Sequence, residues 1–458
     1  MNVNEVTRSL ARFVVETEYN DLPRETVERA KECFLDWLGC AFIGSTAEST
    51  RILLELIREE GGIKEATIIN GGRTSCLNAA LINGASSHAM EFDDVHKASI
   101  SHPAAAVIPA ALAAAEREKA SGVIFLTSIV LGYDVSIRVG EGVGPSHYKY
   151  WHTTGTCGTF GAAAAAGKVL GLDEDMMLDA LGNAGTQAAG LWEFITDGAM
   201  TKVLHPAKAA MNGLLSALLA KNGFTGATRI LEGEKGFCKA TSSEYDLEKI
   251  TRGLGENYKI LEVSFKPYPC CRHTHSTIKA ALDLSREHAL DYKNVKSAHV
   301  QIYSTAIEIA GNLQPKTPRE AKFSLPYCLA VALKCQRVGL DEFARSHLED
   351  EETHKLMNRV QLTINPDLDA AYPGMWPTIV EIETRQGELF KKRIDFPPGD
   401  PENPLTKEEL RGKFRRLAGS VVEERDMESI IEMIERLEMV EDISKVTGAL
   451  REASAQGS

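Results

Sequence analysis

Acidic and imidazole side chains are concentrated in residues 88–103, which read HAMEFDDVHKASISHP. Those that could do chemistry are Glu91, Asp93, Asp94, His88, His96 and His102. A loop that carries a general base and the carboxylate that orients it would have this composition. We expect His102 at the start of the alanine-rich helix that begins at Pro103, where the positive helix end also attracts an anion. The segment therefore predicts part of an acid–base active site.

Two other interpretations of this segment remain open. Asp93, Asp94, His96 and His102 are competent ligands for a divalent metal ion, but their spacing does not match a ligand motif such as H-E-x-x-H. Alternatively, the acids are solvated residues of a capping loop. The pattern favours catalysis over both, and no metal is predicted.

A second segment, WHTTGTCG at residues 151–158, brings hydroxyl and backbone N–H groups to the start of a helix. His152 stands just before them, so these groups could form a cradle for a carboxylate. The sequence lacks the G-x-x-x-x-G-K-[ST] pattern, which argues against a nucleotide. The alternative for Gly158 and Gly161 is close helix packing.

Two basic segments follow. In MTKVLHPAK, residues 200–208, the charged groups are Lys202, His205 and Lys208, and we expect at least one lysine to face a cavity that binds phosphate or carboxylate. A solvated basic turn is the alternative. In KPYPCCRHTH, residues 266–275, two cations and two imidazoles stand where the pattern changes to a smaller domain. Clefts between domains are common ligand sites.

These segments together suit a polycarboxylate substrate. Removing a proton next to a carboxylate creates an enediolate-like charge, so the site must hold that carboxylate with fixed cations and N–H groups while a base takes the proton. Histidine titrates near the working pH and is the expected base.

Composition excludes several classes of protein. The chain has 458 residues, of which 43% are hydrophobic and 25% charged, as in an ordinary globular protein of two to three domains. The net charge of -13 argues against nucleic acid or an anionic membrane as partner. The longest strongly apolar run, residues 103–115, is shorter than the roughly 20 residues that a membrane span needs.

The N-terminal region and the cysteines predict a cytoplasmic protein. The first 21 residues, MNVNEVTRSLARFVVETEYND, carry charges throughout and lack the apolar core of a signal or anchor. Nine cysteines without any C-x-x-C pair predict reduced thiols. We interpret the adjacent Cys270 and Cys271 as small buried residues at a turn rather than a redox or metal pair.

The first 260 residues predict mainly helix. Amphipathic runs occupy Val3–Glu16, Arg24–Leu38, Thr50–Glu60 and Met176–Ala184. Three further runs are rich in small residues and predict central helices of a tightly packed bundle: 103–115, 158–171 and 206–220.

The pattern changes after about residue 265. Strands are predicted at 298–304 and 360–365, with two more in 378–395 around Gln386 and Gly387. Capping-box signals start helices at Thr317–Glu320 and Thr406–Glu409, and FPPGDPENP at 396–404 predicts a linker. We therefore expect a mainly α protein with an α+β insertion: a discontinuous all-helical domain, 1–264 and 405–458, and a smaller α+β lid domain, 265–404.

The same segments carry a family resemblance that spans nearly the whole chain. HAMEFDDVHKASISHPAAAVIPAALAAAE, GYDVSIRVG, WHTTGTCGTFGAAAAAGKVLGL, MTKVLHPAKAAMNGLLSALLAKNGFTG, KPYPCCRHTHSTIKAAL and AKFSLPYCLAVAL occur in the order found in the MmgE/PrpD family, which the chain resembles. That family includes 2-methylcitrate dehydratases, cis-aconitate decarboxylases and iminodisuccinate epimerases.

The resemblance implies an enzyme without cofactor, usually a homodimer, with its site in the cleft between a helical domain and a lid. The residues at matching positions are Asp93, His102, His152, Lys202, Lys266, His275 and Tyr327. We assign proton transfer to His102 and His152, an orienting or acidic role to Asp93, and carboxylate binding to the two lysines. His275 and Tyr327 would line the site from the smaller domain, and Tyr327 joins the catalytic set. His96 and Arg272 are further candidates for substrate binding.

Some positions depart from the family pattern. Glu91 stands where many relatives carry Asp, Val95 where Thr is frequent, and Ala207 where Gly is common. Cys271 lies close to a position at which the decarboxylase branch carries a histidine, which weakens a decarboxylase assignment.

The first functional hypothesis is a hydro-lyase, a carbon–oxygen lyase resembling 2-methylcitrate dehydratase, that eliminates water from a citrate-like polycarboxylate. An epimerase, isomerase or decarboxylase of a related di- or tricarboxylate is the alternative, since all these reactions stabilise a carbanion beside a carboxylate. A binding protein that kept the fold and lost the chemistry is the third possibility.

Overall fold

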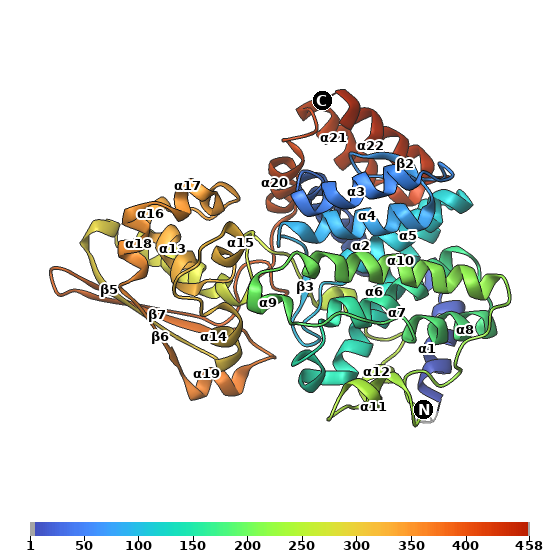
Figure 1. Cartoon of the computed structure of the whole chain (residues 1–458), viewed down its shortest axis with the longest axis horizontal. Coiled ribbons are helices and arrows are strands. Elements are labelled where there is room, and N and C mark those ends of the chain that lie inside the picture. Colours follow the sequence, from blue (N-terminus) through green and yellow to red (C-terminus); the bar gives the residue numbers. More distant parts are fainter. Residues whose placement is uncertain (1–4, 457–458) are drawn as a thin grey trace. The chain divides into compact units, whose positions relative to one another are not determined.

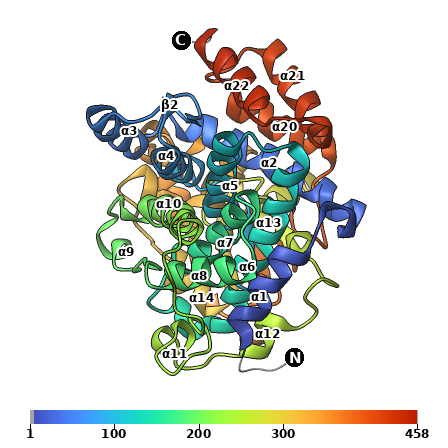
Figure 2. The same cartoon turned by 90° about the vertical axis from the view of Figure 1, so that its right-hand side faces the viewer.

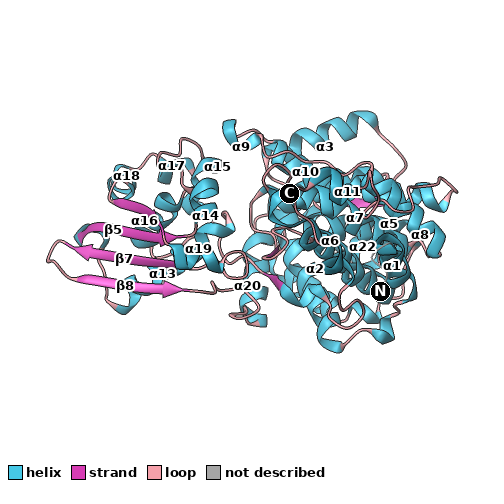
Figure 3. Cartoon of the chain, turned by 90° about the horizontal axis from the view of Figure 1, so that it is seen from below, coloured by secondary structure: helices cyan, strands magenta, loops and turns pink. Residues whose placement is uncertain are grey.

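The computed structural model describes residues 5–456, and these form two compact units. Of the described residues, 5–263 and 406–456 belong to the first unit, and 264–405 make up the second. The first is helical apart from short strands, and the second combines a sheet with helices (Figures 1 and 3). The chain is therefore mainly α with a smaller α+β part, as the sequence predicts.

Long helices build the first unit. They are α1 (Val6–Glu16), α2 (Arg24–Gly44), α3 (Glu48–Glu60), α4 (Cys76–Ala89), α5 (Ala104–Glu118), α6 (Gly122–Tyr148), α7 (Thr153–Val169), α8 (Glu174–Gly185), α10 (Thr201–Lys221), α20 (Lys407–Ala418), α21 (Glu424–Glu435) and α22 (Ser444–Gln456).

Short elements of this unit connect the long helices. They are η2 (Tyr19–Asp21), β1 (Ala66–Ile68), β2 (Gly72–Thr74), β3 (Val95–His96), α9 (Phe194–Asp197), α11 (Phe237–Thr241), α12 (Leu247–Thr251), η3 (Lys259–Glu262) and η7 (Leu437–Met439), where η denotes a 3-10 helix. The predicted amphipathic helices are confirmed as α1, α2, α3 and α8. Residues 3 and 4 of the first prediction lie outside the described part of the chain.

The three predicted small-residue helices are confirmed as α5, α7 and α10, which lie together at the centre of the first unit (Figure 2). Glycines allow them to approach closely. A Cβ atom on Gly161 would stand 2.5 Å from the Gly132 carbonyl oxygen, and one on Gly213 would stand 2.4 Å from Ala162 Cβ. The packing role proposed for Gly161 is therefore confirmed.

Helix α6 is a long, buried core helix that was not among the helices predicted from the sequence. It is the one helix among the described residues long and apolar enough to cross a membrane, but 89% of its apolar window is buried inside the protein. Asp134 and Arg138 interrupt its apolar run in the sequence, yet they pair with each other at 2.6 Å inside the unit. The helix kinks at Gly144, whose φ is 67°, just before Pro145.

Helices α20, α21 and α22 return to the first unit, where α20 and α21 pack on α2. Three buried hydrogen bonds hold them there. Lys413 Nζ of α20 donates to Asp36 at 2.6 Å and to the Phe92 carbonyl at 2.7 Å. Thr447 Oγ1 of α22 donates to Glu116 at 2.6 Å. The bond to Phe92 supports the backbone directly before Asp93, so the C-terminal segment helps to position residues 88–103.

The second unit is built on a four-stranded sheet with the order β6-β5-β7-β8. Strands β5 (Val295–Ile302) and β6 (Val360–Ile364) are parallel, while β7 (Thr378–Thr384) is antiparallel to β5 and to β8 (Leu389–Ile394). The predicted strands are thereby confirmed. The alternating burial of β5 and β7 gives the sheet one buried face, on which α13 packs (Figure 3).

The other elements of the second unit are mostly short helices. They are η4 (Arg272–Thr274), α13 (His275–Glu287), η5 (Tyr292–Asn294), α14 (Ser304–Ala310), α15 (Pro318–Ala321), α16 (Leu325–Cys335), η6 (Asp341–Phe343), α17 (Arg345–Leu348), α18 (Glu351–Met357) and α19 (Pro366–Ala371), and β4 (Val263–Ser264) stands at its start. Thr317 caps α15 as predicted, but that helix is a single turn. The capping box at Thr406 and Glu409 is complete.

The predicted linker at 396–404 contains no helix or strand and lies just before residue 406, where the first unit resumes. This linker is fixed by buried contacts. Asp400 within it is completely buried, pairs with Arg272, and accepts a hydrogen bond from Ser264 Oγ at 2.7 Å. The Gly399 carbonyl accepts from the Phe265 N–H at 2.9 Å. The prolines and the glycine of this segment predicted its turns correctly. The ion pair between Asp400 and Arg272 could not be predicted, because the fold alone brings these two residues together.

Candidate functional site

Residues 88–103 run from the last turn of α4 to the start of α5, and Asp94 closes this loop on itself. Its Oδ1 accepts from the Ala104 N–H at 3.2 Å and its Oδ2 from the Tyr133 hydroxyl at 2.8 Å. Burial raises the pKa of Asp94 well above its usual value, and the adjacent charge of Asp93 raises it further. Asp94 therefore has a structural role, and its side chain favours the neutral carboxyl form.

Asp93 lies between two imidazoles. Its Oδ2 is 2.7 Å from His88 Nδ1 and 3.4 Å from His102 Nδ1, and His88 and Asp93 are both completely buried. The predicted orienting role of Asp93 therefore applies first to His88. His88 Nε2 is buried and has no hydrogen-bond partner among residues 5–456. Buried polar atoms are normally satisfied, so this atom marks a costly and unusual position.

His102 has a defined tautomer. Its Nδ1 lies 2.6 Å from the carbonyl oxygen of Asp94, which can only accept, so Nδ1 carries the hydrogen. In the neutral ring Nε2 is then the basic nitrogen. The side chain is 13% exposed, whereas that of His88 is inaccessible. His102 thus combines a fixed orientation with access from outside, which a general base requires.

His152 precedes the first turn of α7 and faces several imidazoles. Its ring centroid is 5.7 Å from that of His88 and 6.5 Å from that of His102, and its Nδ1 is 3.1 Å from His205 Nδ1. Burial, with the charge of Lys202 next, holds the pKa of His152 well below its usual value. Burial likewise lowers the pKa of His205 to about 4. Both rings are neutral near pH 7.

The threonines after His152 contact the loop that carries His102. Thr153 Oγ1 donates to the Ile100 carbonyl at 2.8 Å, and Thr154 Oγ1 accepts from the His102 N–H at 3.1 Å. Their position at a helix start was predicted correctly, and the carboxylate cradle stays a prediction.

Lys202 is 3% exposed and forms a buried ion pair with Glu91. Glu91 has a left-handed backbone conformation with φ 59°, which is uncommon for residues other than glycine. Such strained conformations occur most often at functional sites. A cation held beside neutral imidazoles is well placed to bind a carboxylate.

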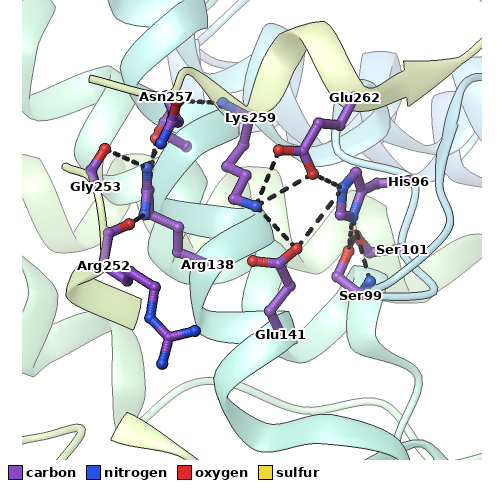
Figure 4. A network of polar contacts seen from close by, with 11 residues as sticks. His96, Ser99, Ser101, Arg138, Glu141, Arg252, Gly253, Asn257, Lys259 and Glu262 are labelled. Atoms are coloured by element: carbon purple, nitrogen blue, oxygen red, sulfur yellow. Dashed lines mark hydrogen bonds and ion pairs between the residues drawn. The ribbon is translucent and has the colours of Figure 1, made fainter. Parts of the chain in front are cut away.

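His96 belongs to a different network (Figure 4). The Ser99 N–H donates to His96 Nδ1 at 3.2 Å, so the hydrogen of the neutral ring is on Nε2, which points at Glu262 Oε2 at 3.2 Å. Lys259 Nζ joins Glu141 at 3.1 Å and Glu262 at 3.0 Å. Burial pushes the pKa of Glu262 upward, but the contacts with His96 and Lys259 outweigh it and lower the pKa to about 2.

The four-residue metal arrangement considered from the sequence is not present, because Asp94 and His96 face other partners. Two other groups have metal-ligand geometry among the described residues: His88 with Asp93 and His102, and His96 with Glu141 and Glu262. In the second group the ammonium of Lys259 already lies against both carboxylates. In the first, Asp93 is already hydrogen-bonded to His88.

The remaining predicted site residues lie in the second unit. Arg272 pairs with Asp400, and its Nη1 donates to His275 Nδ1 at 2.8 Å, while His275 Nε2 is 3.2 Å from the Cys270 carbonyl. Lys266 is completely buried. The Tyr327 hydroxyl donates to the Glu342 carbonyl at 2.6 Å. Arg272 and His275 are thus brought together, and the catalytic role of Tyr327 stays a prediction.

His88, His205 and Glu91 belong to segments that the sequence identifies as functional, but the sequence predicts no individual role for them. Each stood within a segment that was recognised, and spacing alone did not separate them from their neighbours. His88 and Glu91 stand three residues apart in one segment, yet one contacts Asp93 and the other Lys202. Cys270 and Cys271 are buried thiols outside any disulfide, which confirms their interpretation as small buried residues.

Comparison with known proteins covers most of the chain. Residues 8–250 match the MmgE/PrpD N-terminal domain and residues 268–439 match the MmgE/PrpD C-terminal domain. A cis-aconitate decarboxylase-like protein, oryM, of Aspergillus oryzae is 29% identical over 96% of either chain. The cis-aconitate decarboxylase of Aspergillus terreus is 29% identical over 96% of this chain and 94% of its own. The human cis-aconitate decarboxylase is 28% identical over 98% of this chain and 95% of its own.

Proposed function

Because the chain belongs to the MmgE/PrpD family, we propose that it is a lyase that needs no cofactor and acts on a citrate-like polycarboxylate. One observation carries this proposal. His102, with its Nδ1 fixed on the Asp94 carbonyl, stands in a group of imidazoles that also contains neutral His152, beside the buried cation Lys202. This set can move a proton at a carbon whose carboxylate is held in place.

In the proposed mechanism Lys202 binds a substrate carboxylate and stabilises the negative charge that develops next to it. His102 Nε2 exchanges a proton with the carbon, and the Asp94 carbonyl and the Asp93 carboxylate stabilise the charged ring. His152 is neutral and can donate or accept a second proton. The carbanion is the common intermediate, whether a carboxyl group or a hydroxyl group leaves.

Loss of carbon dioxide is the first reaction to test. The relatives that match nearly the whole chain are named cis-aconitate decarboxylases, which supports a substrate of this kind. In that reaction the bond to one carboxyl carbon breaks, its electron pair remains on the neighbouring carbon, and a proton from an imidazolium returns there.

Dehydration of citrate or 2-methylcitrate is the second candidate. Cys271, which lies close to a position where decarboxylases carry a histidine, favours it. Here the base removes the proton beside the carboxylate and the hydroxyl group leaves as water after it is protonated. Both reactions pass through a carbanion stabilised beside a carboxylate, but dehydration forms it by removing a proton and decarboxylation forms it by losing carbon dioxide.

Proton NMR in deuterated buffer tests the proposal. The chelator-treated protein is incubated with cis-aconitate, citrate, 2-methylcitrate and amino-dicarboxylates. A new methylene-alkene product from cis-aconitate identifies the decarboxylase, an alkene from citrate or 2-methylcitrate identifies the hydro-lyase, and deuterium exchange without either identifies an epimerase. His102→Ala should abolish the signal, and His354→Ala, at an exposed position in the second unit, should not. Silence on every substrate, with and without added divalent metal, would refute a lyase of this class.

A further inference from the structure

A cavity of about 450 Å³ lies in the first unit on one side of His205. Volumes of roughly 300–1,000 Å³ are typical of small-molecule sites. Its walls are mainly apolar and include Trp151, Leu191, Phe194 and Leu204. Leu191 is 55% exposed and Leu204 is 38% exposed, so large apolar side chains line this cavity without being covered.

Lys208 is the cation of this cavity, and it differs from the other lysines on its helix. Lys202 pairs with Glu91, and Lys221 pairs with Glu118 at 3.1 Å. For Lys208 no ion pair or hydrogen bond of the side chain is found among residues 5–456, although the residue is partly buried. Burial alone lowers its pKa, without a carboxylate to raise it again. Partial burial of an uncompensated charge is unfavourable and is relieved by an anionic ligand.

The lining limits the charge and shape of that ligand. His205 is neutral near pH 7, and Glu193 adds one carboxylate to the lining, so the cavity does not suit three negative charges. The apolar walls gain from contact with hydrocarbon, which a compact tricarboxylate lacks. One carboxylate with a short hydrocarbon tail satisfies both requirements.

We propose that this cavity binds an amphiphilic monocarboxylate, with the carboxylate on Lys208 and the hydrocarbon tail against Leu191, Phe194 and Leu204. The site is separate from His102 and Lys202, but His205 connects it to them. The His205 ring lines the cavity, and its Nδ1 lies 3.1 Å from His152 Nδ1. An occupant therefore alters the surroundings of His152.

Binding of hexanoate to the full chain tests this site without any need for turnover. Titration calorimetry should give a dissociation constant for hexanoate at least about tenfold lower than that for uncharged hexanamide. Lys208→Met retains the aliphatic stem and removes the charge, so it should weaken hexanoate about tenfold or more. Lys221→Met on the same helix is the matched control and should leave binding unchanged. Circular dichroism verifies that each variant is folded.

Leu204→Asn tests the apolar wall independently, and it should weaken hexanoate and hexanamide alike. Equal affinity of the native chain and Lys208→Met for hexanoate would overturn the proposal, as would no binding at about 10 mM. Sedimentation velocity tests whether a second copy of the chain, rather than a small molecule, occupies the cavity. If Leu204→Asn dissociates a dimer and hexanoate does not bind, the cavity is part of an interface between two copies and the proposal fails.

Competition identifies the source of the ligand. If both bind together, the cavity holds a separate monocarboxylate, as proposed. If a polycarboxylate that is turned over displaces hexanoate, the cavity is part of the polycarboxylate site and the proposal of a separate site fails. Neither result bears on whether turnover occurs, so this proposal and the proposed lyase activity fail independently.

Discussion

Residues 88–103 contribute to two side-chain clusters that use histidine and carboxylate in opposite ways. In the first cluster His88, His102 and Asp93 lie together with more imidazoles than carboxylates, and His88 Nε2 has no hydrogen-bond partner among the described residues. In the second cluster His96 contacts Glu141 and Glu262, and Lys259 pairs with both carboxylates, so that opposite charges compensate one another (Figure 4). The first arrangement costs stability and keeps reactive groups available, whereas the second holds the loop.

The largest expected difference between the two clusters is in activity. His102→Ala removes the proposed base and should lower kcat/KM by roughly 10²–10⁴-fold. His96→Ala removes a group of the holding network and should change kcat/KM by about tenfold or less, with a lower melting temperature. Product formation by NMR and thermal melting measure both. Equal losses of activity in two folded variants would show that the two clusters do not differ in function.

Lys202 and Glu91 extend the comparison to buried ion pairs. Lys202→Met leaves the Glu91 carboxylate buried without its cation, which should lower the free energy of unfolding by about 3–5 kcal/mol. Adding Glu91→Gln should restore most of that stability but not activity. Lys221→Met, which breaks a more exposed pair, should cost about 1 kcal/mol or less. Urea denaturation measures all three, and no recovery in the double variant would refute the pairing argument.

Variants of His88 test whether His88 and His102 compete for the Asp93 carboxylate. His88→Phe removes the donor at 2.7 Å, so Asp93 can interact more strongly with His102 and favour its charged form. The acidic limb of the kcat/KM profile should then move up by about one pH unit. His88→Asn keeps an N–H donor and should leave the limb near its native position. Identical profiles for the two variants would show that His88 does not act through Asp93.

His205, which contacts His152, and Glu262, which contacts His96, should contribute to stability in different pH windows. The pKa of His205 is lowered to about 4 in the folded protein, so the unfolded chain binds the proton more tightly, and stability falls as pH falls from about 6.5 to 4. The slope is at most about 1.4 kcal/mol per pH unit for one group. His205→Gln should reduce this slope.

Glu262 acts at lower pH. Its pKa is lowered to about 2 in the folded protein, so its contribution is present above about 4.5 and is lost between about 4.5 and 2. The effect is smaller than for a buried group because the side chain is 46% exposed. Glu262→Gln should remove pH dependence in this window only. Denaturant melts across both windows separate the groups, and a His205→Gln effect confined below pH 4 would contradict the assignment.

The sequence by itself determined the local structure and the kind of chemistry. Small residues at 103–115 and 206–220 specified helices that pack closely, and alternation at 298–302 specified a strand, because burial of one face depends on spacing along the chain. Charged and imidazole residues next to helix starts identified the segments that meet in the first unit.

Only the tertiary structure decided which of these residues are partners. Asp94 accepts a hydrogen bond from Tyr133, Lys202 forms an ion pair with Glu91, and Asp400 of the linker at 396–404 forms an ion pair with Arg272. These contacts join residues that are 39, 111 and 128 positions apart in the chain. Neighbours such as Asp93 and Asp94 are chemically alike and differ only in the surroundings that the packed helices provide. Burial and partner, not residue type, therefore separate the catalytic candidates from the structural groups.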